Sequence, residues 1–391
     1  MTDRKLIIDT PFWKDLYAGE DPAFDPERAS DLFAQIPEFA RLANFTAEEL
    51  EKLSVELEKI AADPEQFRFW DLYRRTIMQE GTAGGDPAAI ELKISSPHVN
   101  PHAIRLAVLL ACIPDYIALY KEKDWYDPAF SEALLDIRIW MDFCAQNYNG
   151  AFGIADLGFA WIRAQIHGLV IRFGRLQCNT PTKFFNYYRV FRNRESRQLQ
   201  ALMNDDFAFD RNGMTALTPE DAAFHSAPVE ETAGTVSGYG VSPDGLVSAE
   251  KITLDKSHWE EVLRPGDTVI NLHIPADGPL DVEACRASCR RMKDFYVEKL
   301  GVEPKAFVCE SWLLDPMFSR LMPADSNILA FQRMGYLLPW PGASELVVRV
   351  FGVNGIDAVP HNTRMRKIFA EFIREGGRTR NGAFFFFPED L

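Results

Sequence analysis

The sequence predicts an α+β protein, with an all-helical N-terminal domain (residues 1–155) before a mixed α/β domain (residues 156–391) built on a central twisted sheet. Three observations lead to this fold class. Apolar residues recur at helical spacing over residues 26–166, and the pattern changes to alternation near residue 168. Residues 267–336 then show a strand, a loop, an amphipathic helix, a second strand and a second helix. Such a unit places a helix N-terminus beside a strand end, where cofactors commonly bind.

Capping and turn signals define the helices of the first domain. Thr46, with a glutamate three residues later, has the spacing of a capping box before a segment with one apolar stripe. Pro64 and Pro101 each mark the first residue of a further helix, and Asp127-Pro128 marks the start of another. The glycines and prolines of residues 80–89 predict a loop.

Turn residues separate the elements predicted in the second domain. Asn212-Gly213 predicts a tight turn, and Pro243-Asp244-Gly245 predicts a hairpin. The predicted strands are residues 168–178, 186–192, 268–275, 306–314, 344–353 and 382–388, and the segments 207–217 and 235–254 each contain one of these turns, the second between two runs rich in β-forming residues. Helices are predicted at residues 281–300 and 362–377. We expect the apolar terminal strand AFFFF (383–387) to lie in the core of the sheet rather than at a dimer edge.

Composition excludes several classes of partner. With 57 acidic and 42 basic residues, the net charge of −15 disfavours nonspecific binding to nucleic acid or to anionic membranes. The short basic run 189–197 is typical of a solvated face or a strand edge. The start of the chain lacks a signal-peptide pattern, and the most apolar helical stretch, around 103–120, carries Arg105 and Asp115. We therefore expect a cytoplasmic protein without nucleic-acid or membrane partners.

The six cysteines lie at 112, 144, 178, 285, 289 and 309, and none forms a CxxC pair. Cys285 and Cys289 are four residues apart on a predicted helix, where they share a face with Met292 and Tyr296. Buried, reduced thiols are the expected state, with no metal bound.

The strand 268–275 carries polar residues on one face. Alternation places Asn271 and His273 there together with Val269. Histidine is the commonest acid/base group near neutral pH, so His273 is a candidate catalytic residue. A structural histidine of the core or of a strand edge is the alternative.

The strand 306–314 places Glu310 on the same face as Val308 and Trp312. Burial in this apolar run would raise the pKa of Glu310 and suit it to accept a proton near neutral pH. The alternative is a structural ion pair with Arg320 or Arg333.

A candidate cofactor corner follows the first of these strands. The loop 275–279 leads into a helix that begins at Asp281, and a helix N-terminus attracts phosphate. Asp277, Asp281 and Glu283 would repel a pyrophosphate there, so an ordinary capped loop with Gly278 at its turn is the alternative. The sequence has no GxSxG, GxxxxGK[ST], GxGxxG or HExxH motif, which leaves the corresponding hydrolase, nucleotide and metalloprotease classes without support.

Several spaced strings resemble a family of bacterial acyltransferase-domain proteins, in which a helical N-terminal domain precedes a GNAT-like C-terminal domain. They are Gly174-Arg-Leu-Gln177, Leu263-Arg-Pro-Gly-Asp267, His273-Ile-Pro275 with Gly278-Pro-Leu280, Ser311-Trp-Leu-Leu-Asp-Pro316, and Ser326-Asn-Ile328 with Phe331. The resemblance covers nearly the whole chain. It implies that strand 268–275 and strand 306–314 splay apart around the pantetheine arm of an acyl-CoA, with helix 281–300 between them in sequence.

The resemblance also implies an activity, namely transfer of an acyl group, such as acetyl from acetyl-CoA, to a small-molecule amine without a covalent intermediate. The implied catalytic residues are His273, Glu310 and Tyr336, with Tyr336 replacing the usual tyrosine as the acid for the leaving thiolate. The implied cofactor-binding residues are Ile274, Ala276, Asp277, Gly278, Ser326 and Asn327. The usual Arg/Gln-x-x-Gly-x-Gly/Ala loop of the wider GNAT pattern is replaced here by the acidic loop.

Two other functions remain open at this point. A GNAT-derived protein without catalysis would bind a ligand or a partner, and a hydrolase or another acid/base enzyme would use His273 with Glu310. Diverging strands at 268–275 and 306–314 would favour the transferase. A closed sheet filled by Trp312 and Phe331 would favour the binding protein.

Overall fold

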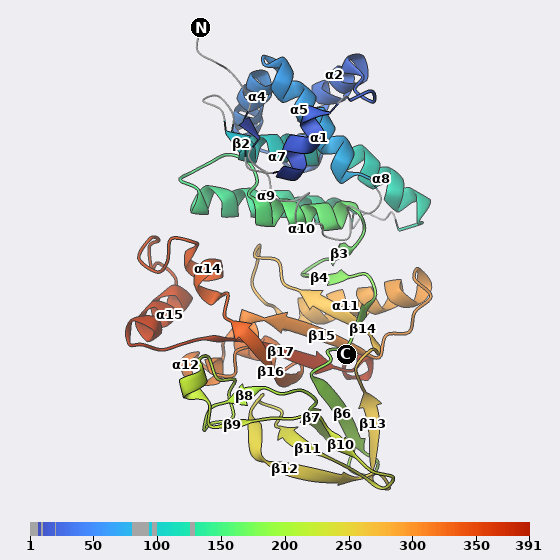
Figure 1. Cartoon of the computed structure of the whole chain (residues 1–391), viewed down its shortest axis with the longest axis vertical. Helices are drawn as coiled ribbons and strands as arrows, with labels where there is room; N and C mark the ends of the chain where they lie inside the picture. Colours follow the sequence, from blue (N-terminus) through green and yellow to red (C-terminus); the bar gives the residue numbers. More distant parts are fainter. Residues whose placement is uncertain (1–6, 9–10, 20, 80–93, 96–99, 126–129) are drawn as a thin grey trace. The chain divides into compact units, whose positions relative to one another are not determined.

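The computed structural model describes residues 7–8, 11–19, 21–79, 94–95, 100–125 and 130–391, and the chain divides into two compact units (Figure 1). The first unit runs to Arg172 and includes Pro275–Asp277, and the second comprises Phe173–Ile274 and Gly278–Leu391. The division therefore falls after residue 172 rather than residue 155. The reason is that helix α10 (Asp156–Ile166) packs against helices of the first unit.

Up to residue 169, the described part of the first unit is helical apart from one pair of two-residue strands, β1 (Ile7–Ile8) and β2 (Ile94–Ser95). Its other helices are α1 (Pro11–Ala18), α2 (Pro26–Ala34), α3 (Ile36–Leu42), α4 (Ala47–Ala61), α5 (Pro64–Ile77), α7 (Pro101–Ala111), α8 (Ile113–Glu122) and α9 (Phe130–Asn147). The capping box before α4 is confirmed, because Thr46 Oγ1 accepts from Glu49 N at 3.2 Å and the Glu49 carboxylate accepts from Thr46 N at 2.6 Å. The starts at Pro64 and Pro101 are confirmed too. The predicted loop 80–89 and helix start at Asp127-Pro128 lie outside the described residues.

One helical stretch in the described part of the chain, Pro101–Glu122, is long and apolar enough to cross a membrane by length and composition. The sequence analysis did not expect such a stretch, because charged residues interrupt it. In the structure it consists of α7 and α8, and every residue from Ala103 to Ala111 is buried within the helical unit. A core helix of this kind meets the same criterion, so packing accounts for its composition.

The second unit contains a seven-stranded sheet in the order β16–β17–β15–β14–β4–β3, with β5 also paired to β14. Its strands are β3 (Val170–Phe173), β4 (Leu176–Asn179), β5 (Thr182–Lys183), β14 (Thr268–His273), β15 (Ala306–Ser311), β16 (Tyr336–Ala343) and β17 (Arg380–Phe386). β14 and β15 run parallel, whereas β17 lies antiparallel between β15 and β16, as expected for a core strand. The single strand predicted at 168–178 is a hairpin of β3 and β4 that turns at Gly174, whose φ is 65°.

A six-stranded sheet packs against one face of the first. Its order is β10–β11–β7–β6–β13, with β12 beside β11, and Pro243-Asp244-Gly245 forms the predicted turn between β11 and β12. Its strands are β6 (Tyr188–Asn193), β7 (Leu199–Met203), β10 (Glu230–Glu231), β11 (Thr235–Val241), β12 (Val247–Asp255) and β13 (Trp259–Leu263). A small pair, β8 (Ala208–Phe209) and β9 (Phe224–His225), lies beside them. One core cluster includes Tyr188 and Val241 of this sheet together with Val269 and Val308 of the seven-stranded sheet.

The helices of the second unit are α11 (Val282–Glu298), α12 (Phe318–Leu321), α13 (Asn327–Gln332), α14 (Leu346–Phe351) and α15 (Arg364–Arg374). α11 buries the predicted stripe that contains Cys285, Cys289, Met292 and Tyr296. All six cysteines are buried free thiols. The strand predicted at 344–353 is wrong, because this segment forms α14.

The string SWLLDP has a structural role at the end of β15. Trp312–Leu314 forms a 3₁₀ turn, after which the fully buried Asp315 accepts hydrogen bonds from Arg380 N at 2.6 Å and Met317 N at 2.9 Å. A Cβ at Gly382 of β17 would lie 2.0 Å from the Leu314 carbonyl oxygen. The turn is therefore fixed to β17, and this anchors the carboxyl end of β15.

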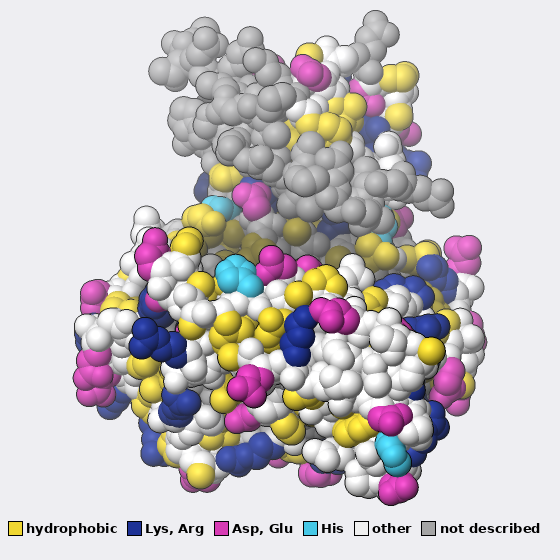
Figure 2. All heavy atoms as spheres, turned by 60° about the horizontal axis from the view of Figure 1, so that its bottom comes forward, with side chains coloured by type: hydrophobic (Ala, Val, Ile, Leu, Met, Phe, Trp, Pro, Cys, Tyr) yellow, Lys and Arg dark blue, Asp and Glu magenta, His cyan; other side chains and the backbone are white. Residues whose placement is uncertain are grey.

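Acidic and basic side chains are interspersed over the face of the second unit that Figure 2 shows. The basic run 189–197 takes part in this mixture. Arg189 pairs with Glu261 at 2.6 Å and with Glu231 at 2.8 Å, and Arg194 pairs with Glu260 at 2.9 Å. The run is thus a solvated face with compensated charge.

Candidate active site

The two parallel strands β14 and β15 separate at their carboxyl ends. Their pairing runs from Val269 opposite Ala306 to Leu272 opposite Cys309. Beyond that point, His273 pairs with β4, and Glu310 pairs with β17. Both strands keep the outer neighbours that they already have at Leu272 and Cys309, and only the pairing between β14 and β15 ends, as expected where the two strands diverge.

The aromatic residues expected in a closed sheet pack elsewhere. Trp312 lies in the 3₁₀ turn, where it contacts Phe318 and Phe369, with ring centroids 6.2 Å away in each case. Phe331 of α13 packs on Phe384 at 5.1 Å. The arrangement that would favour a binding protein is therefore not formed by these two side chains.

Several polar side chains lie together on the face of β14 that is turned away from α11. Asn271 and His273 share this face with Val269, which belongs to the core between the two sheets. Asn179, the last residue of β4, joins them, because its Oδ1 lies 2.5 Å from His273 Nε2 and 3.2 Å from Asn271 Nδ2. The Tyr296 hydroxyl of α11 donates to the Asn179 carbonyl oxygen and holds the end of β4 in place.

His273 is neutral at physiological pH. Burial lowers its pKa to about 4, since an imidazolium loses hydration in this site. With the side-chain amide oxygen Oδ1 of Asn179 as its partner, Nε2 carries the hydrogen and Nδ1 carries the lone pair. A neutral imidazole is a proton acceptor, although at this pKa a weak base.

Glu310 lies at the separated end of β15, on the face that also holds Val308. The sequence analysis considered it buried, whereas the structure leaves the residue largely exposed. Partial enclosure of the carboxylate raises its pKa, the Glu345 carboxylate raises it further, and the Trp340 side chain opposes the shift. Glu310 makes no ion pair with a described residue, so the alternative of a pair with Arg320 or Arg333 finds no support.

An aromatic wall lies beside Glu310. Trp340 sits in an irregularity of β16, where the register shifts between Pro339 and Ala343, and it packs on Phe185 at 4.7 Å and on Tyr187 at 5.4 Å. Bulges of this kind often redirect a side chain next to an active site. The sequence analysis missed this wall. The available signal was the string PWPG (339–342), in which two prolines interrupt a run of strand-forming residues.

Tyr336 is located away from this group. It lies on β16, with β17 between it and β15, and its ring stacks on Phe385 at 5.2 Å. Its hydroxyl donates to the Val241 carbonyl oxygen at 2.5 Å, and burial raises its pKa to about 12. Alternation thus places His273 and Glu310 on the face that holds Val269 and Val308, and Tyr336 packs in the same core cluster but across β17 from β15. The catalytic roles of all three residues stay predictions.

The loop after β14 is held by arginines that the sequence analysis did not single out. Within the second unit, Arg175 donates to the carbonyl oxygens of Gly278 and Pro279, both at 2.8 Å. Asp281 caps α11 by accepting from Ala284 N at 2.8 Å. Ile274 directly follows β14 and is half-buried.

Ala276 and Asp277 group with the first unit, where both are exposed. Asp277 accepts from Arg172, whose guanidinium also donates to Asp136 at 2.7 Å. Arg172 therefore compensates the charge of Asp277, and the expected repulsion of a pyrophosphate by this residue is reduced.

Ser326 and Asn327 lie at the start of α13. Ser326 accepts from Ile328 N at 3.2 Å, and Asn327 is exposed. α13 packs against α11 and the 3₁₀ turn, so these residues lie on the α11 side of the sheet. They are thus on the opposite side of the sheet from Asn271 and His273.

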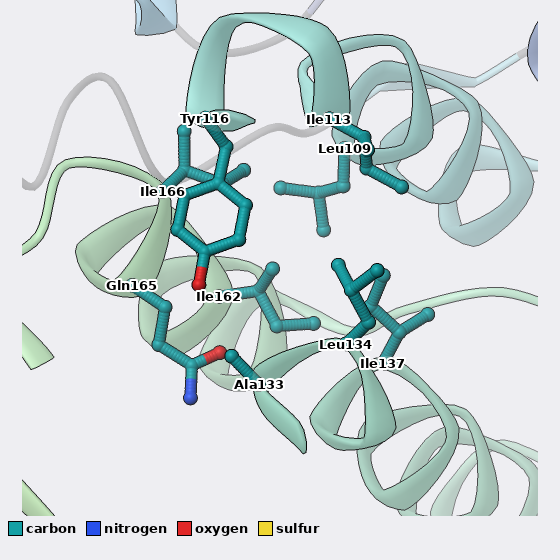
Figure 3. Close-up of a pocket in the computed structure, with 9 residues that line it drawn as sticks. All are labelled: Leu109, Ile113, Tyr116, Ala133, Leu134, Ile137, Ile162, Gln165 and Ile166. Atoms are coloured by element: carbon teal, nitrogen blue, oxygen red, sulfur yellow. The ribbon is translucent and has the colours of Figure 1, made fainter. Parts of the chain in front are cut away.

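Two hollows elsewhere carry no acid/base chemistry. A cavity of about 10 Å³ in the helical unit is lined by aliphatic side chains with Tyr116 and Gln165 (Figure 3). A groove of about 340 Å³ on the six-stranded sheet is lined by Gln200, two serines and small or aliphatic residues. Neither lining contains a carboxylate, histidine, lysine or cysteine, and in the described part of the chain no group of three or more His, Cys, Asp or Glu could hold a metal ion.

Comparison with known proteins defines the class of this protein. Residues 170–386 match the GNAT-like C-terminal domain, and residues 34–168 match the N-acyltransferase N-terminal domain. Because the first match spans more than half of the chain, the chain belongs to the family with the GNAT-like C-terminal domain. The family resemblance and the fold class expected from the sequence are confirmed. A search of curated proteins returns no match.

Solved structures that share this fold include those of acyltransferases. One, a complex with decanoyl-CoA and teicoplanin, has a TM-score of 0.57 at 17% identity over 95% of this chain and 93% of that chain. Another, a mutant in complex with octanoyl-CoA, has a TM-score of 0.58 at 16% identity over 95% of this chain and 92% of that chain. At these identities the likeness shows the fold.

Proposed function

We propose that this protein is an acyl-CoA-dependent N-acyltransferase that transfers an acyl group directly to the amine of a small molecule. The observation that carries the proposal is the separation of β14 and β15 beyond Leu272 and Cys309, with His273 and Glu310 on the same face of the sheet. The family of the chain supports it, as do the octanoyl-CoA and decanoyl-CoA bound by structures of the same fold.

The acyl-CoA would lie between the separated strand ends, with its phosphates toward the start of α11. Free N–H groups of a helix N-terminus and the Arg175 guanidinium favour anions, and Gly278 keeps the approach open because a Cβ there would meet nothing within 4 Å. Ile274 and Gly278 would contact the donor with their backbone. Ala276, Asp277, Ser326 and Asn327 stay proposed cofactor contacts. We expect acetyl-CoA and longer acyl-CoAs as donors.

Each step of the proposed reaction is assigned to a particular group of the chain. A backbone N–H at the end of β14 stabilises the oxyanion as the amine nitrogen bonds to the thioester carbon. His273 or Glu310 accepts the proton that the amine loses, directly or through water, and the C–S bond then breaks. Positioning supplies most of the rate, since no covalent enzyme intermediate is formed. For Tyr336 to protonate the thiolate, its hydroxyl must first break its hydrogen bond to the Val241 carbonyl oxygen.

Calorimetric titration with acetyl-CoA, octanoyl-CoA and decanoyl-CoA tests the donor site. The informative variant is Gly278→Trp, and Gly234→Trp is the matched control, because a Cβ at either glycine meets nothing within 4 Å and neither residue has a positive φ. We expect micromolar binding to the wild type and the control, and at least tenfold weaker binding to Gly278→Trp. Absence of binding of every acyl-CoA to the wild type would contradict the proposal.

Activity is then measured as amine-dependent release of CoA, detected with a thiol reagent. Release that requires an amine indicates transfer. Release at the same rate without an amine indicates hydrolysis and contradicts the N-acyltransferase assignment.

A further inference from the structure

The end of β4 supplies the hydrogen-bond partner for the polar residues of β14. Asn179 Oδ1 accepts from both His273 Nε2 and Asn271 Nδ2, and the Asn179 carbonyl oxygen accepts from the buried Tyr296 of α11. Asn179 is thereby fixed from one side by the helix and contacts the candidate active site on the other. No sequence motif pointed to this residue.

We propose that Asn179 is a positioning residue of the active site, an inference that rests on the proposed function. Asn179 holds His273 in the Nε2–H tautomer and directs its Nδ1 lone pair. The side-chain amide oxygen of Asn179 accepts hydrogen bonds but does not donate them. His273 can therefore bind this oxygen only through a protonated Nε2. Neutral imidazole has one N–H, and the lone pair is therefore placed on Nδ1. Tautomer and ring orientation are set by the same contact.

An amide at position 179 also decides the charge state of the imidazole. A carboxylate in this place would stabilise the imidazolium, whereas the neutral amide leaves burial as the determining influence on His273. The titratable groups on the strands paired with β14 are Lys183 on β5, Cys178 on β4, and Cys309 and Glu310 on β15, and α11 adds Tyr296 and the other ionisable residues of its sequence. None of them contributes a shift to His273. The imidazole therefore remains unprotonated and able to receive the proton of an attacking amine.

The second partner of Asn179 supports a ligand site at this place. Asn271 Nδ2 donates to Asn179, while Asn271 Oδ1 is buried without a hydrogen-bond partner in the described part of the chain. A buried acceptor without a partner is unfavourable, and a ligand N–H would satisfy it. Asn179 thus orients two acceptors, Asn271 Oδ1 and His273 Nδ1, on one face.

Nuclear magnetic resonance of the full chain with ¹⁵N-labelled histidine tests the proposal, with the His273 signals assigned from a His273→Gln variant. In the wild type we expect a protonated Nε2 and an unprotonated Nδ1 at pH 7. In Asn179→Asp we expect the pKa of His273 to rise by at least one unit, a tenfold gain in proton affinity, because a carboxylate then faces Nε2. The matched control is Asn362→Asp at an exposed position, which should leave His273 unchanged.

A protonated Nδ1 in the wild type would overturn the proposal, as would an unchanged pKa in Asn179→Asp. The wild-type tautomer needs no variant, so the proposal stays testable even if Asn179→Asp does not fold. The pH profile of amine-dependent CoA release separates this inference from the proposed function. If His273 titrates as expected but the acid limb of kcat/KM does not move in Asn179→Asp, the positioning contact stands and the base role of His273 is overturned.

Discussion

At the scale of single residues, the site depends on polar groups placed where the two sheets of the second unit meet. Alternation along β14 was enough to place Asn271 and His273 on one face. The same reasoning did not find Asn179, because its contact with His273 joins residues 94 positions apart in the chain. Tyr336 is a different case: the family resemblance assigned it a role that stays a prediction, and the fold shows that its hydroxyl donates to the Val241 carbonyl oxygen.

We expect His273 to make stability depend on pH in the acid range. Its pKa is about 4 in the folded state and near 6.5 when exposed, so the unfolded state binds more protons between these values and stability falls as pH falls from 6.5 to 4. Between pH 7 and pH 4.5 the wild type should lose on the order of 2 kcal/mol more than His273→Gln. Urea unfolding at both pH values measures this, with exposed His258→Gln as the control. Equal losses in wild type and His273→Gln would contradict the lowered pKa.

Glu310 is expected to act in catalysis rather than in donor binding. Glu310→Gln keeps the shape of the side chain but removes the base, so kcat/KM for the amine should fall by about 10²-fold or more. Calorimetry should show unchanged affinity for acyl-CoA. Because the pKa of Glu310 is raised, wild-type activity should fall as the carboxylate becomes protonated at acid pH. The pH–activity profile of Glu310→Gln should not show this fall at acid pH. Exposed Glu303→Gln is the matched control, and an equal loss in both variants would argue against the role.

At the scale of elements, caps and turns were predicted correctly from the sequence, whereas the strand predicted from the β-branched residues of one short segment was wrong. The capping box at Thr46 and the turn at Pro243-Asp244-Gly245 form as expected, because their hydrogen bonds connect near neighbours in sequence. The segment 344–353 was predicted as a strand from its valines. It forms helix α14 because burial of Leu346, Val350 and Phe351 on one side and the Glu345–Arg349 pair at 2.8 Å outweigh propensity.

The contact between β17 and the turn after β15 should be sensitive to one added methyl group. A Cβ at Gly382 would lie 2.0 Å from a backbone carbonyl oxygen that no side-chain movement can displace. Gly382→Ala should therefore reduce the free energy of unfolding by about 3 kcal/mol, measured by denaturant titration. Gly234→Ala, with open space around its Cβ, should stay within about 1 kcal/mol of wild type. Similar stability of the two variants would show that β17 and the turn are not tightly packed.

At the scale of the whole molecule, the net charge of −15 is distributed in ion pairs and exposed carboxylates rather than in one patch on the face that Figure 2 shows. A negative protein attracts cations over distances longer than a contact, and salt screens this attraction. The charge therefore bears on the rate at which a cationic acceptor arrives, and it says nothing about which acceptor is used.

We expect kcat/KM for a singly charged amine to fall several-fold as ionic strength rises from about 0.02 M to 0.5 M, with acyl-CoA kept saturating. An amine that also carries a carboxylate has no net charge and is the matched control, so its kcat/KM should change little. Parallel salt dependence for both acceptors would mean that the overall charge does not steer the amine.

The sequence by itself determined the order of helical and mixed units, most of the strands around the site, the face of β14 that carries His273, and the family. These features depend on periodicity, caps and turns, which act over a few residues. Tertiary structure decided the rest: that β14 and β15 separate beyond Leu272, that Trp340 stands beside Glu310, and that Asn179 holds His273. Each of these joins strands that are distant in the chain, and their register is set by packing of the complete sheets, which no local pattern encodes.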